Sequence, residues 1–350
     1  MIKSRTYIAI PPGTTIKEQL NDRKMSQKEF ASRMDMSEKH ISRLINGEVQ
    51  LTCDVAMRLE SVLGLPAHFW NNLEIIYREK LIKAQEENEM DSDLEIVKKF
   101  PYNEMAKNGW VEVTYNPKEK VFNLRKFFEV VNLGLVSGHL IPRIVCRKLG
   151  DGDKSDYALI SWSQKAKLES RSLSVRSVNI EKLKTLLPDI RKMTTKNPSD
   201  FCPILRKELA DCGIALTFLP HIGGSFLHGA TFYDGGKIVL GMTVRGKDAD
   251  RFWFSLFHEI GHIVLEHINQ TEGTTDEDEK AADAFARNLL IPDEQFDAFT
   301  LNKDFSKTAI ITFANKMEID AGIVLGRLQK EQFIPFSRHS ELKTKYELTA

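Results

Sequence analysis

With 350 residues, of which 42% are hydrophobic, the chain is long enough for two or three globular domains with buried cores. Its formal net charge is zero, so overall charge favours neither a nucleic-acid partner nor a membrane. We find no signal peptide and no apolar run long enough to span a bilayer, which predicts a cytoplasmic protein. Four scattered cysteines without a C-x-x-C pair indicate reduced thiols: Cys53, Cys146, Cys202 and Cys212.

Residues 1–85 are predicted to form an all-α unit of five helices. The helix-breaking run Pro11-Pro12-Gly13 precedes the first, and serines that can cap a helix begin the next two. Glu29, three residues after Ser26, indicates a capping box. The expected helices run from Thr14 or Thr15 to about Asp22, from Ser26 to Met34, from Ser37 to about Asn46-Gly47, over Thr52–Leu63 and over Ala67–Ala84.

The second and third of these helices are short and joined by a tight turn, which is the helix-turn-helix arrangement. The stretches PPGTTIKEQL, MSQKEFASRMDMSEKHISRLINGEVQLT and LGLPAHFWNNLEIIYREKL resemble HigA-type antitoxins of the XRE helix-turn-helix class over nearly all of residues 10–81. The resemblance implies DNA binding and, less specifically, an antitoxin role. Six apolar residues would form the core: Phe30, Ala31, Met34, Ile41, Leu44 and Ile45.

Polar residues at the start of the second helix and along the third are the candidate DNA contacts, because the second helix of such a pair enters the major groove. Residues 1–85 hold 13 Lys/Arg against 10 Asp/Glu, so charge alone predicts weak non-specific binding to DNA. For each candidate the alternative is a solvated surface position. The candidates are Gln27, Lys28, Ser37, Lys39, His40, Ser42 and Arg43.

A homodimer on a double-stranded operator is expected, because helix-turn-helix domains usually bind palindromic sites as dimers. The fifth predicted helix carries an apolar stripe that could form the dimer face. Packing in the core of the same unit is an equally good use of such a stripe. Its residues are Phe69, Trp70, Leu73, Ile76 and Tyr77.

Residues 86–200 are predicted to be a linker and a helical middle module. Gln85–Asp93 is polar and acidic, which is typical of a linker, and Lys148–Asp156 is a polar loop that contains glycine. We favour a scaffold role for this region and assign it no chemistry. Helices are expected over Asp93–Phe100, Val121–Leu133, Ser155–Leu168 and Ile180–Met193.

From Cys212 the pattern changes to short β-rich segments separated by glycine-containing turns, which predicts a small sheet. An edge strand of such a sheet could hold a peptide by strand addition. His221, His228 and Tyr233 are candidates to stabilise a tetrahedral oxyanion, with a structural role as the alternative for each. The expected strands are Ile214–Leu219, Gly229–Tyr233 and Lys237–Leu240.

Asp250–His267 reads DRFWFSLFHEIGHIVLEH and contains the H-E-x-x-H motif of His258, Glu259 and His262. A helix brings residues i and i+4 to one face, so both imidazoles can bind one zinc ion, with Glu259 as general base on its water. Two hydrogen-bonded buried histidines are the alternative. Glu266 would lie about 12 Å along the axis from His258, too far to be a third ligand. The motif is surrounded by apolar residues, which predicts a buried helix: Phe252, Trp253, Phe254, Leu256, Phe257, Ile260, Ile263, Val264 and Leu265.

The third ligand is therefore expected on the next helix. Glu277–Pro292 reads EDEKAADAFARNLLIP, and its apolar residues recur at helical spacing. Extending this apolar face toward the start of the helix takes in Asp278 and Glu279. We prefer Glu279 as the third ligand, with Asp278 as the rival. Asp283, one turn after Glu279, would accept a hydrogen bond from a ligand imidazole.

DRFWFSLFHEIGHIVLEH, together with the E-x-x-A-D-A-F-A and LLIP that follow, resembles the ImmA/IrrE family of zinc metallopeptidases. GIALTFLPHIGGSFLHGATFYDGGKIVLG and AGIVLGRLQKE extend the resemblance over roughly Cys202–Phe336. It implies His258 and His262 as zinc ligands, Glu259 as the base and Glu279 as the third ligand. Characterised relatives cleave helix-turn-helix repressors, so the resemblance also implies a substrate class.

An internal similarity links the two ends of the chain. FASRMDMS (Phe30–Ser37) and FANKMEID (Phe313–Asp320) match at Phe, Ala and Met, and apolar residues follow both. This predicts a second helix-turn-helix-like pair. We favour two helices that pack on the peptidase over a substrate or DNA exosite.

These patterns predict a mainly α protein with a small β-sheet (α+β). It comprises a helix-turn-helix domain (1–85), a linker and helical middle module (86–200) and a zincin-like metallopeptidase domain (201–350). The expected function is a transcriptional regulator whose zinc endopeptidase cleaves a repressor-type protein, either a partner or the chain itself in the acidic linker. Manganese or iron would suit the same ligands. The alternatives are a non-proteolytic, ligand-sensing repressor or antitoxin, and a peptidase that uses its DNA domain only for localisation.

Overall fold

The computed structural model describes residues 2–4, 6–136, 153–223, 228–243, 247–269 and 274–347. It divides into two compact units, Met1–Glu95 (unit 1) and Ile96–Ala350 (unit 2). The chain is mainly helical, and unit 2 contains a small sheet, which confirms the predicted fold class. The predicted boundaries of three domains stay a prediction. None of the described helices combines the length and apolar content of a membrane span.

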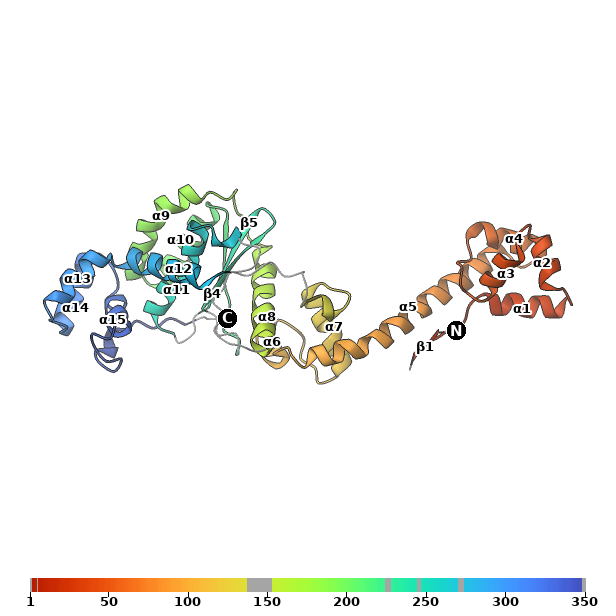
Figure 1. Ribbon diagram of the computed structural model, residues 1–350, viewed down its shortest axis with the longest axis horizontal. Coiled ribbons are helices and arrows are strands. Elements are labelled where there is room, and N and C mark those ends of the chain that lie inside the picture. Colours follow the sequence, from red (N-terminus) through yellow and green to blue (C-terminus); the bar gives the residue numbers. More distant parts are fainter. Residues whose placement is uncertain are drawn as a thin grey trace. The chain divides into compact units, whose positions relative to one another are not determined.

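Unit 1 is a helical bundle with a short two-stranded ribbon (Figure 1). The hydroxyls of Ser26 and Ser37 each accept a hydrogen bond from the backbone N–H three residues on, as predicted, and the hydroxyl of Thr52 does the same. The predicted first cap is wrong, because α1 begins directly after Pro12 with no side-chain cap. The elements are β1 (Ile2–Lys3), β2 (Ile8–Ala9), α1 (Gly13–Asp22), α2 (Gln27–Arg33), α3 (Glu38–Ile45), α4 (Cys53–Leu63) and α5 (Ala67–Val97).

The helix-turn-helix pair is α2 and α3. Asp35, in the turn between them, has a left-handed backbone with φ of 52°. All six predicted core residues of this pair are buried. The apolar stripe of α5 mostly packs in the same core, because Trp70 is buried in it and Phe69 and Leu73 pack against it, whereas Ile76 is 48% exposed. Glu29 pairs with Arg33 one turn later, so its carboxylate does not form the predicted capping box.

The predicted linker Gln85–Asp93 is wrong, because these residues continue α5. Buried residues recur along this part of the helix at helical spacing, namely Ala84, Met90, Asp93 and Val97. Five of its nine residues, namely Gln85, Glu86, Glu87, Glu89 and Met90, are good helix formers, so its polarity marks a solvated helix face rather than a loop.

Unit 2 has a three-stranded sheet in the order β3-β5-β4, in which β5 is parallel to β3 and antiparallel to β4. The three predicted strands are confirmed, as are the helices predicted at Ser155–Leu168 and Ile180–Met193. Cys146 and most of the predicted loop at Lys148–Asp156 lie outside the described residues.

The helices and strands of unit 2 are α6 (Tyr102–Lys107), α7 (Pro117–Phe128), α8 (Asp153–Ser170), α9 (Ile180–Lys192), α10 (Pro198–Ala210), β3 (Ile214–Phe218), β4 (Gly229–Asp234), β5 (Lys237–Met242), α11 (Ala249–Val264), α12 (Asp276–Leu290), α13 (Asp293–Leu301), α14 (Lys307–Met317) and α15 (Ala321–Lys330). Short 3₁₀ turns are η1 (Leu133–Val136), η2 (Met193–Thr195), η3 (His267–Asn269) and η4 (Ser340–Leu342).

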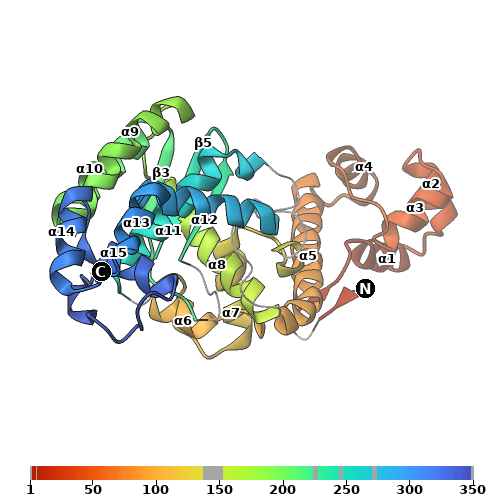
Figure 2. The same ribbon diagram turned by 60° about the vertical axis from the view of Figure 1, so that its left-hand side comes forward.

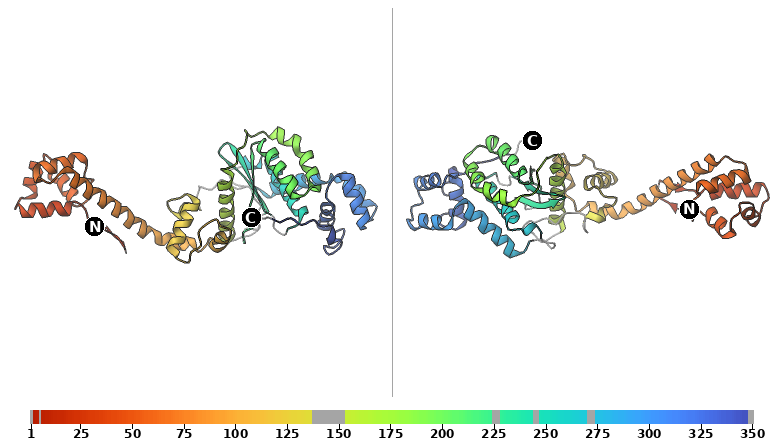
Figure 3. Two further views of the ribbon diagram at one scale, coloured as in Figure 1. Left: turned by 180° about the vertical axis from the view of Figure 1, so that it is seen from behind. Right: turned by 90° about the horizontal axis from the view of Figure 1, so that it is seen from above.

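Helices cover both faces of this sheet, and α12 runs beside α11 (Figure 2). Figures 1 and 3 show α8 on one side of the strands and α10 and α11 on the other. A Cβ at Gly241 would meet the ring of Trp162 on α8, which places odd-numbered β5 residues toward α8. Leu240 and its even-numbered neighbours join the core with α11. The H-E-x-x-H helix thus lies directly against the sheet.

Helix α11 is less completely buried, and shorter, than predicted. Phe254 is 36% exposed and Leu265 is 40% exposed, although most of the other apolar residues of the helix are buried. The helix ends at Val264, and Glu266 beyond it has a left-handed backbone with φ of 62°. The predicted helical span to His267 is therefore too long.

A segment near residue 345 completes the start of α11. The N–H of Ala249 donates to the carbonyl of Thr344, and the N–H of Tyr346 donates to the carbonyl of Lys247. The indole N–H of Trp253 donates to the buried Tyr346 hydroxyl over 2.9 Å. We call Lys343–Tyr346 the strap, because it fastens the beginning of the metal-motif helix.

The predicted second helix-turn-helix-like pair is α14 and α15. Glu318, at the position that matches Asp35, also has a left-handed backbone, with φ of 53°. Most of α15 is buried, including Ile323, Val324 and Leu325. The pair therefore packs in the core of unit 2, which is the favoured of the two predicted uses.

Gly13→Ala should destabilise unit 1. A Cβ at Gly13 would lie 1.9 Å from the carbonyl oxygen of Ile45, and a backbone atom of α3 cannot rotate away. Overpacking of this kind costs about 1–3 kcal/mol, which thermal unfolding of unit 1 would detect. Thr14→Ala, on the exposed face of the same helix, is the control and should change stability by less than about 0.5 kcal/mol. Equal stability of the two variants would contradict the close approach of α1 and α3.

Candidate metal centre

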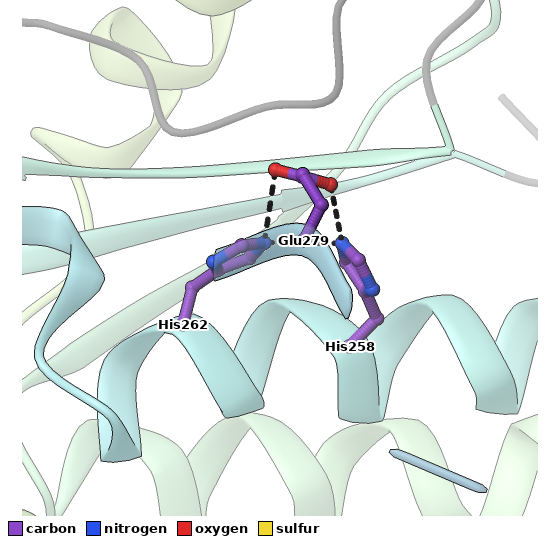
Figure 4. A group of neighbouring side chains, drawn as sticks. All are labelled: His258, His262 and Glu279. Atoms are coloured by element: carbon purple, nitrogen blue, oxygen red, sulfur yellow. Dashed lines mark hydrogen bonds and ion pairs between the residues drawn. The ribbon is translucent and has the colours of Figure 1, made fainter. Parts of the chain in front are cut away.

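Two histidines of α11 and one glutamate of α12 face a common point (Figure 4). The Nε2 atoms of His258 and His262 lie 3.0 Å apart. Glu279 Oε2 lies 3.4 Å from His258 Nε2, and its Oε1 lies 3.5 Å from His262 Nε2. The structure therefore brings together the three side chains that sequence analysis proposed as ligands.

The donor separations suit a tetrahedral metal ion. Zinc–nitrogen bonds are about 2.0–2.1 Å, so two ligand atoms at tetrahedral corners lie about 3.3 Å apart. The observed 3.0–3.5 Å brackets that value. Glu279 Oε2 is also buried without a hydrogen-bond partner, a cost that a cation would offset. The donor set thus fits the metal that the motif implies.

The rival carboxylate Asp278 and the excluded Glu266 both lie elsewhere. Asp278 Oδ2 accepts hydrogen bonds from the backbone N–H and the hydroxyl of Thr275, both over 2.8 Å, and so closes the capping box of α12. Glu266 is exposed beyond the end of α11. Neither belongs to the group formed by His258, His262 and Glu279.

Asp283 orients the first of the two histidines. Its Oδ1 lies 2.8 Å from His258 Nδ1. An ionised carboxylate can only accept, so Nδ1 carries the ring proton, and the lone pair of Nε2 faces the cluster when the ring is neutral. This is the contact that the sequence suggested for Asp283.

Burial and neighbouring charges shift the pKa values of His258, His262 and Glu279 in different directions. Burial alone would lower the pKa of His258, but its contacts with Asp283 and Glu279 raise that pKa to about 10. Burial and the charge of His258 lower the pKa of His262 to about 4. Burial would raise the pKa of Glu279, yet His258 and the Thr274 hydroxyl lower it overall. The metal-free cluster therefore keeps a proton on His258, which a bound cation would displace.

Glu259 is held between α11 and β4. It is 4% exposed, and the hydroxyl of Thr231 donates to its Oε2 over 2.6 Å. A Cβ at Gly229 would lie 2.8 Å from Glu259 Cγ, so the glycine leaves room for this side chain. Burial raises the pKa of Glu259 to about 7, against the charge of His258 and the Thr231 hydrogen bond. A carboxyl group with this pKa can take and release a proton near neutrality.

Three supporting residues were not predicted from the sequence. Thr231 holds Glu259, and the Thr274 hydroxyl donates to Glu279 Oε1 over 2.8 Å. His267 Nδ1 lies 3.0 Å from His262 Nδ1. His267 follows His262 by five residues, a spacing that would put them on different faces of a continuous helix. The left-handed backbone at Glu266 turns the chain so that His267 lies beside His262.

The three oxyanion candidates lie on or beside the sheet. His221 is in the loop after β3, and His228 directly precedes β4. Tyr233 lies on β4, where its half-buried ring packs against the core that includes α11. Their role at an oxyanion remains a proposal.

In unit 1, the candidate DNA contacts are accessible. Gln27 and Lys28 begin α2 and are exposed, as are Ser37, Lys39 and Arg43 at and along α3. His40 and Ser42 are half-buried. Arg43 Nε lies 3.6 Å from a carboxylate oxygen of exposed Glu48, a weak surface pair that DNA could replace.

Comparisons with known proteins agree with the two units. Residues 16–70 match the family described as "Helix-turn-helix", and residues 237–329 match the "IrrE N-terminal-like domain". An uncharacterized HTH-type transcriptional regulator, YddM of Escherichia coli K12, is 36% identical over 63 residues, covering 18% of this chain and 67% of its own length. A solved structure of a HigA-family addiction module antidote protein from Coxiella burnetii is 27% identical, covering 24% of this chain and 94% of that chain, with a TM-score of 0.23.

The fold and these matches define a helix-turn-helix protein with a C-terminal metallopeptidase-like domain. The chain belongs to the XRE-type helix-turn-helix transcriptional regulators, and its C-terminal domain is of the ImmA/IrrE type.

Thr231→Val should raise the pKa of Glu259 above about 7. The hydroxyl stabilises the ionised carboxylate, and a hydrogen bond to a charged group contributes about 1.5–3 kcal/mol, so a rise of about one unit or more is expected. Carbon-13 NMR titration of glutamate carboxyls in metal-free protein would measure it. Thr217→Val removes another buried hydroxyl, on β3, and should leave this titration unchanged. An unchanged or lower pKa in the Thr231 variant would contradict the assignment.

Proposed function

We propose that this protein is a DNA-binding transcriptional regulator whose C-terminal domain is a zinc-dependent endopeptidase. The observation that carries this proposal is the convergence of two imidazoles and one carboxylate beside a second, buried carboxyl group. The helix-turn-helix domain and the IrrE-like domain support the two halves separately.

His258, His262 and Glu279 would hold the metal, with Asp283 fixing the ring of His258. A divalent cation bound there would supply a Lewis acid for a peptide carbonyl and lower the pKa of water. Zinc suits two imidazoles and a carboxylate best, and manganese or iron would be the alternative occupants.

Glu259 would be the proton carrier. Glu259 would accept a proton from the attacking water and then deliver that proton to the leaving amine, because it is a buried carboxyl group beside the three proposed ligands. Thr231 keeps the carboxyl group aimed while this happens, because the pair is buried and cannot exchange partners with solvent.

The substrate would be a protein bound in an extended conformation. In the described sheet β4 is an edge strand, paired with β5 on one side, so a peptide could add to its other side. A helix-turn-helix repressor, a partner or this chain itself, is the substrate class we propose. Self-cleavage within residues 85–93 would first require that part of α5 to unwind, because a helical backbone cannot pair with a strand.

Unit 1 would bring this activity to an operator. Its helix α3 would enter the major groove, where Arg43 or Lys39 would contact phosphates or guanine edges. A homodimer is proposed for this complex, because two-fold operators match two copies of such a domain.

Metal analysis of purified protein tests the peptidase half. We expect one zinc per chain in the wild type and in Glu259→Gln, and none in His262→Ala, because only the last removes a ligand. His68→Ala, an exposed histidine in unit 1, is the control and should keep its zinc. Carefully purified wild type without metal would rule out the proposal. Glu259→Gln should also retain substrates that the wild type cleaves, which supplies the trap for identifying them.

Arg43→Ala tests the DNA half. Loss of a guanine or phosphate contact should weaken binding to the chain's own promoter region by about 1–3 kcal/mol, measured by fluorescence anisotropy. Lys80→Ala removes the same charge from an exposed position on α5 and should have a smaller effect. Equal losses would indicate a purely electrostatic contribution and exclude Arg43 from base recognition.

A further inference from the structure

The two proposed histidine ligands are supported differently. His258 contacts a carboxylate directly, through Asp283. His262 contacts a second imidazole, with 3.0 Å between its Nδ1 and that of His267. His267 Nε2 in turn lies 3.4 Å from Asp278 Oδ1. His262 is fully buried and His267 is 8% exposed, so solvent does not replace these contacts.

Only one arrangement of ring protons lets His262 bind a cation through Nε2. His262 Nδ1 must then carry a hydrogen and donate it to His267 Nδ1, which must be the unprotonated nitrogen of its ring. The hydrogen of neutral His267 therefore sits on Nε2, toward the Asp278 carboxylate. The contact with His267 thus fixes the tautomer of His262, and the contact with Asp278 fixes the tautomer of His267.

Asp278 also ties this series to the third ligand. Its Oδ2 closes the capping box with Thr275, while its Oδ1 faces His267. Glu279 is the next residue along α12. One carboxylate thus fixes the first turn of α12 and, through His267, the ring of His262 on α11.

We propose that His267 is a positioning residue of the metal centre, which holds His262 in the tautomer and orientation that binding requires, with Asp278 behind it. This inference rests on the proposed metal-binding function. His267 does not bind the metal itself, because its Nδ1 accepts the hydrogen bond from His262. Partners of this kind typically change metal affinity about 10–100-fold when removed.

Two substitutions at His267 separate positioning from packing. His267→Phe keeps a ring of similar size but offers no acceptor to His262. His267→Asn is smaller, yet its side-chain oxygen can take the place of Nδ1 as acceptor. We expect His267→Phe to weaken zinc binding about 10–100-fold in chelator competition, and His267→Asn to keep most of the affinity. The visible spectrum of the cobalt-substituted Phe variant should change, whereas that of the Asn variant should match the wild type.

The opposite order of affinities would overturn the inference, because a packing role is better met by Phe than by Asn. Wild-type affinity in His267→Phe would also overturn it. A change in cobalt coordination in both variants would show that His267 is itself a ligand, which contradicts the proposal. Failure of the wild type to bind zinc is a different result, since it removes the metal centre itself.

A second pair of variants serves if His267→Phe does not fold. Asp278→Asn weakens both the capping box and the contact with His267. Thr275→Ala breaks the same capping box but leaves Asp278 beside His267. Zinc affinity should fall further in Asp278→Asn than in Thr275→Ala. Equal affinities would assign the effect to the helix cap alone and overturn the inference.

Discussion

The close packing of α12 along α11 is the constraint on which the candidate site depends. Neither helix supplies a full donor set, so His258 and His262 have no third partner unless Glu279 is brought within reach. Gly261 allows this approach, because a Cβ there would lie 3.1 Å from the Phe285 ring and 3.3 Å from Ala282 Cα. One of the two unspecified positions of H-E-x-x-H therefore has a structural requirement of its own.

This packing places polar groups where an apolar core would be more stable. His262 and Glu259 lie almost fully inside unit 2, against the sheet and beside Phe257 and Ile260. Buried polar groups of this kind destabilise a fold unless each has a partner. Thr231, Asp283 and the other supporting side chains supply most of those partners, and their fixed geometry leaves the remaining donors directed at one point.

The parts of the site that depend on residues close together in the sequence could be predicted, whereas contacts between residues far apart in the sequence could not. The i, i+4 spacing of His258 and His262 and the apolar face of α12 are local patterns, so they indicated the three converging donors from sequence. The contact between Thr231 and Glu259 joins a strand to a helix 28 residues later, and no local pattern encodes it. His267 was missed because a non-glycine left-handed residue, Glu266, ends the helix. The polar residues 85–93 were predicted to be a linker, but they belong to α5 and their polarity reflects its solvent-exposed face.

The strap gives the site an order of assembly. Its backbone hydrogen bonds complete the start of α11, yet Lys345 lies 97 residues after its bridge partner Asp248. A ribosome must therefore synthesise nearly a hundred further residues before the helix that carries the motif can be fastened. The growing chain would emerge with its helix-turn-helix bundle already made and with the start of the H-E-x-x-H helix still unfastened.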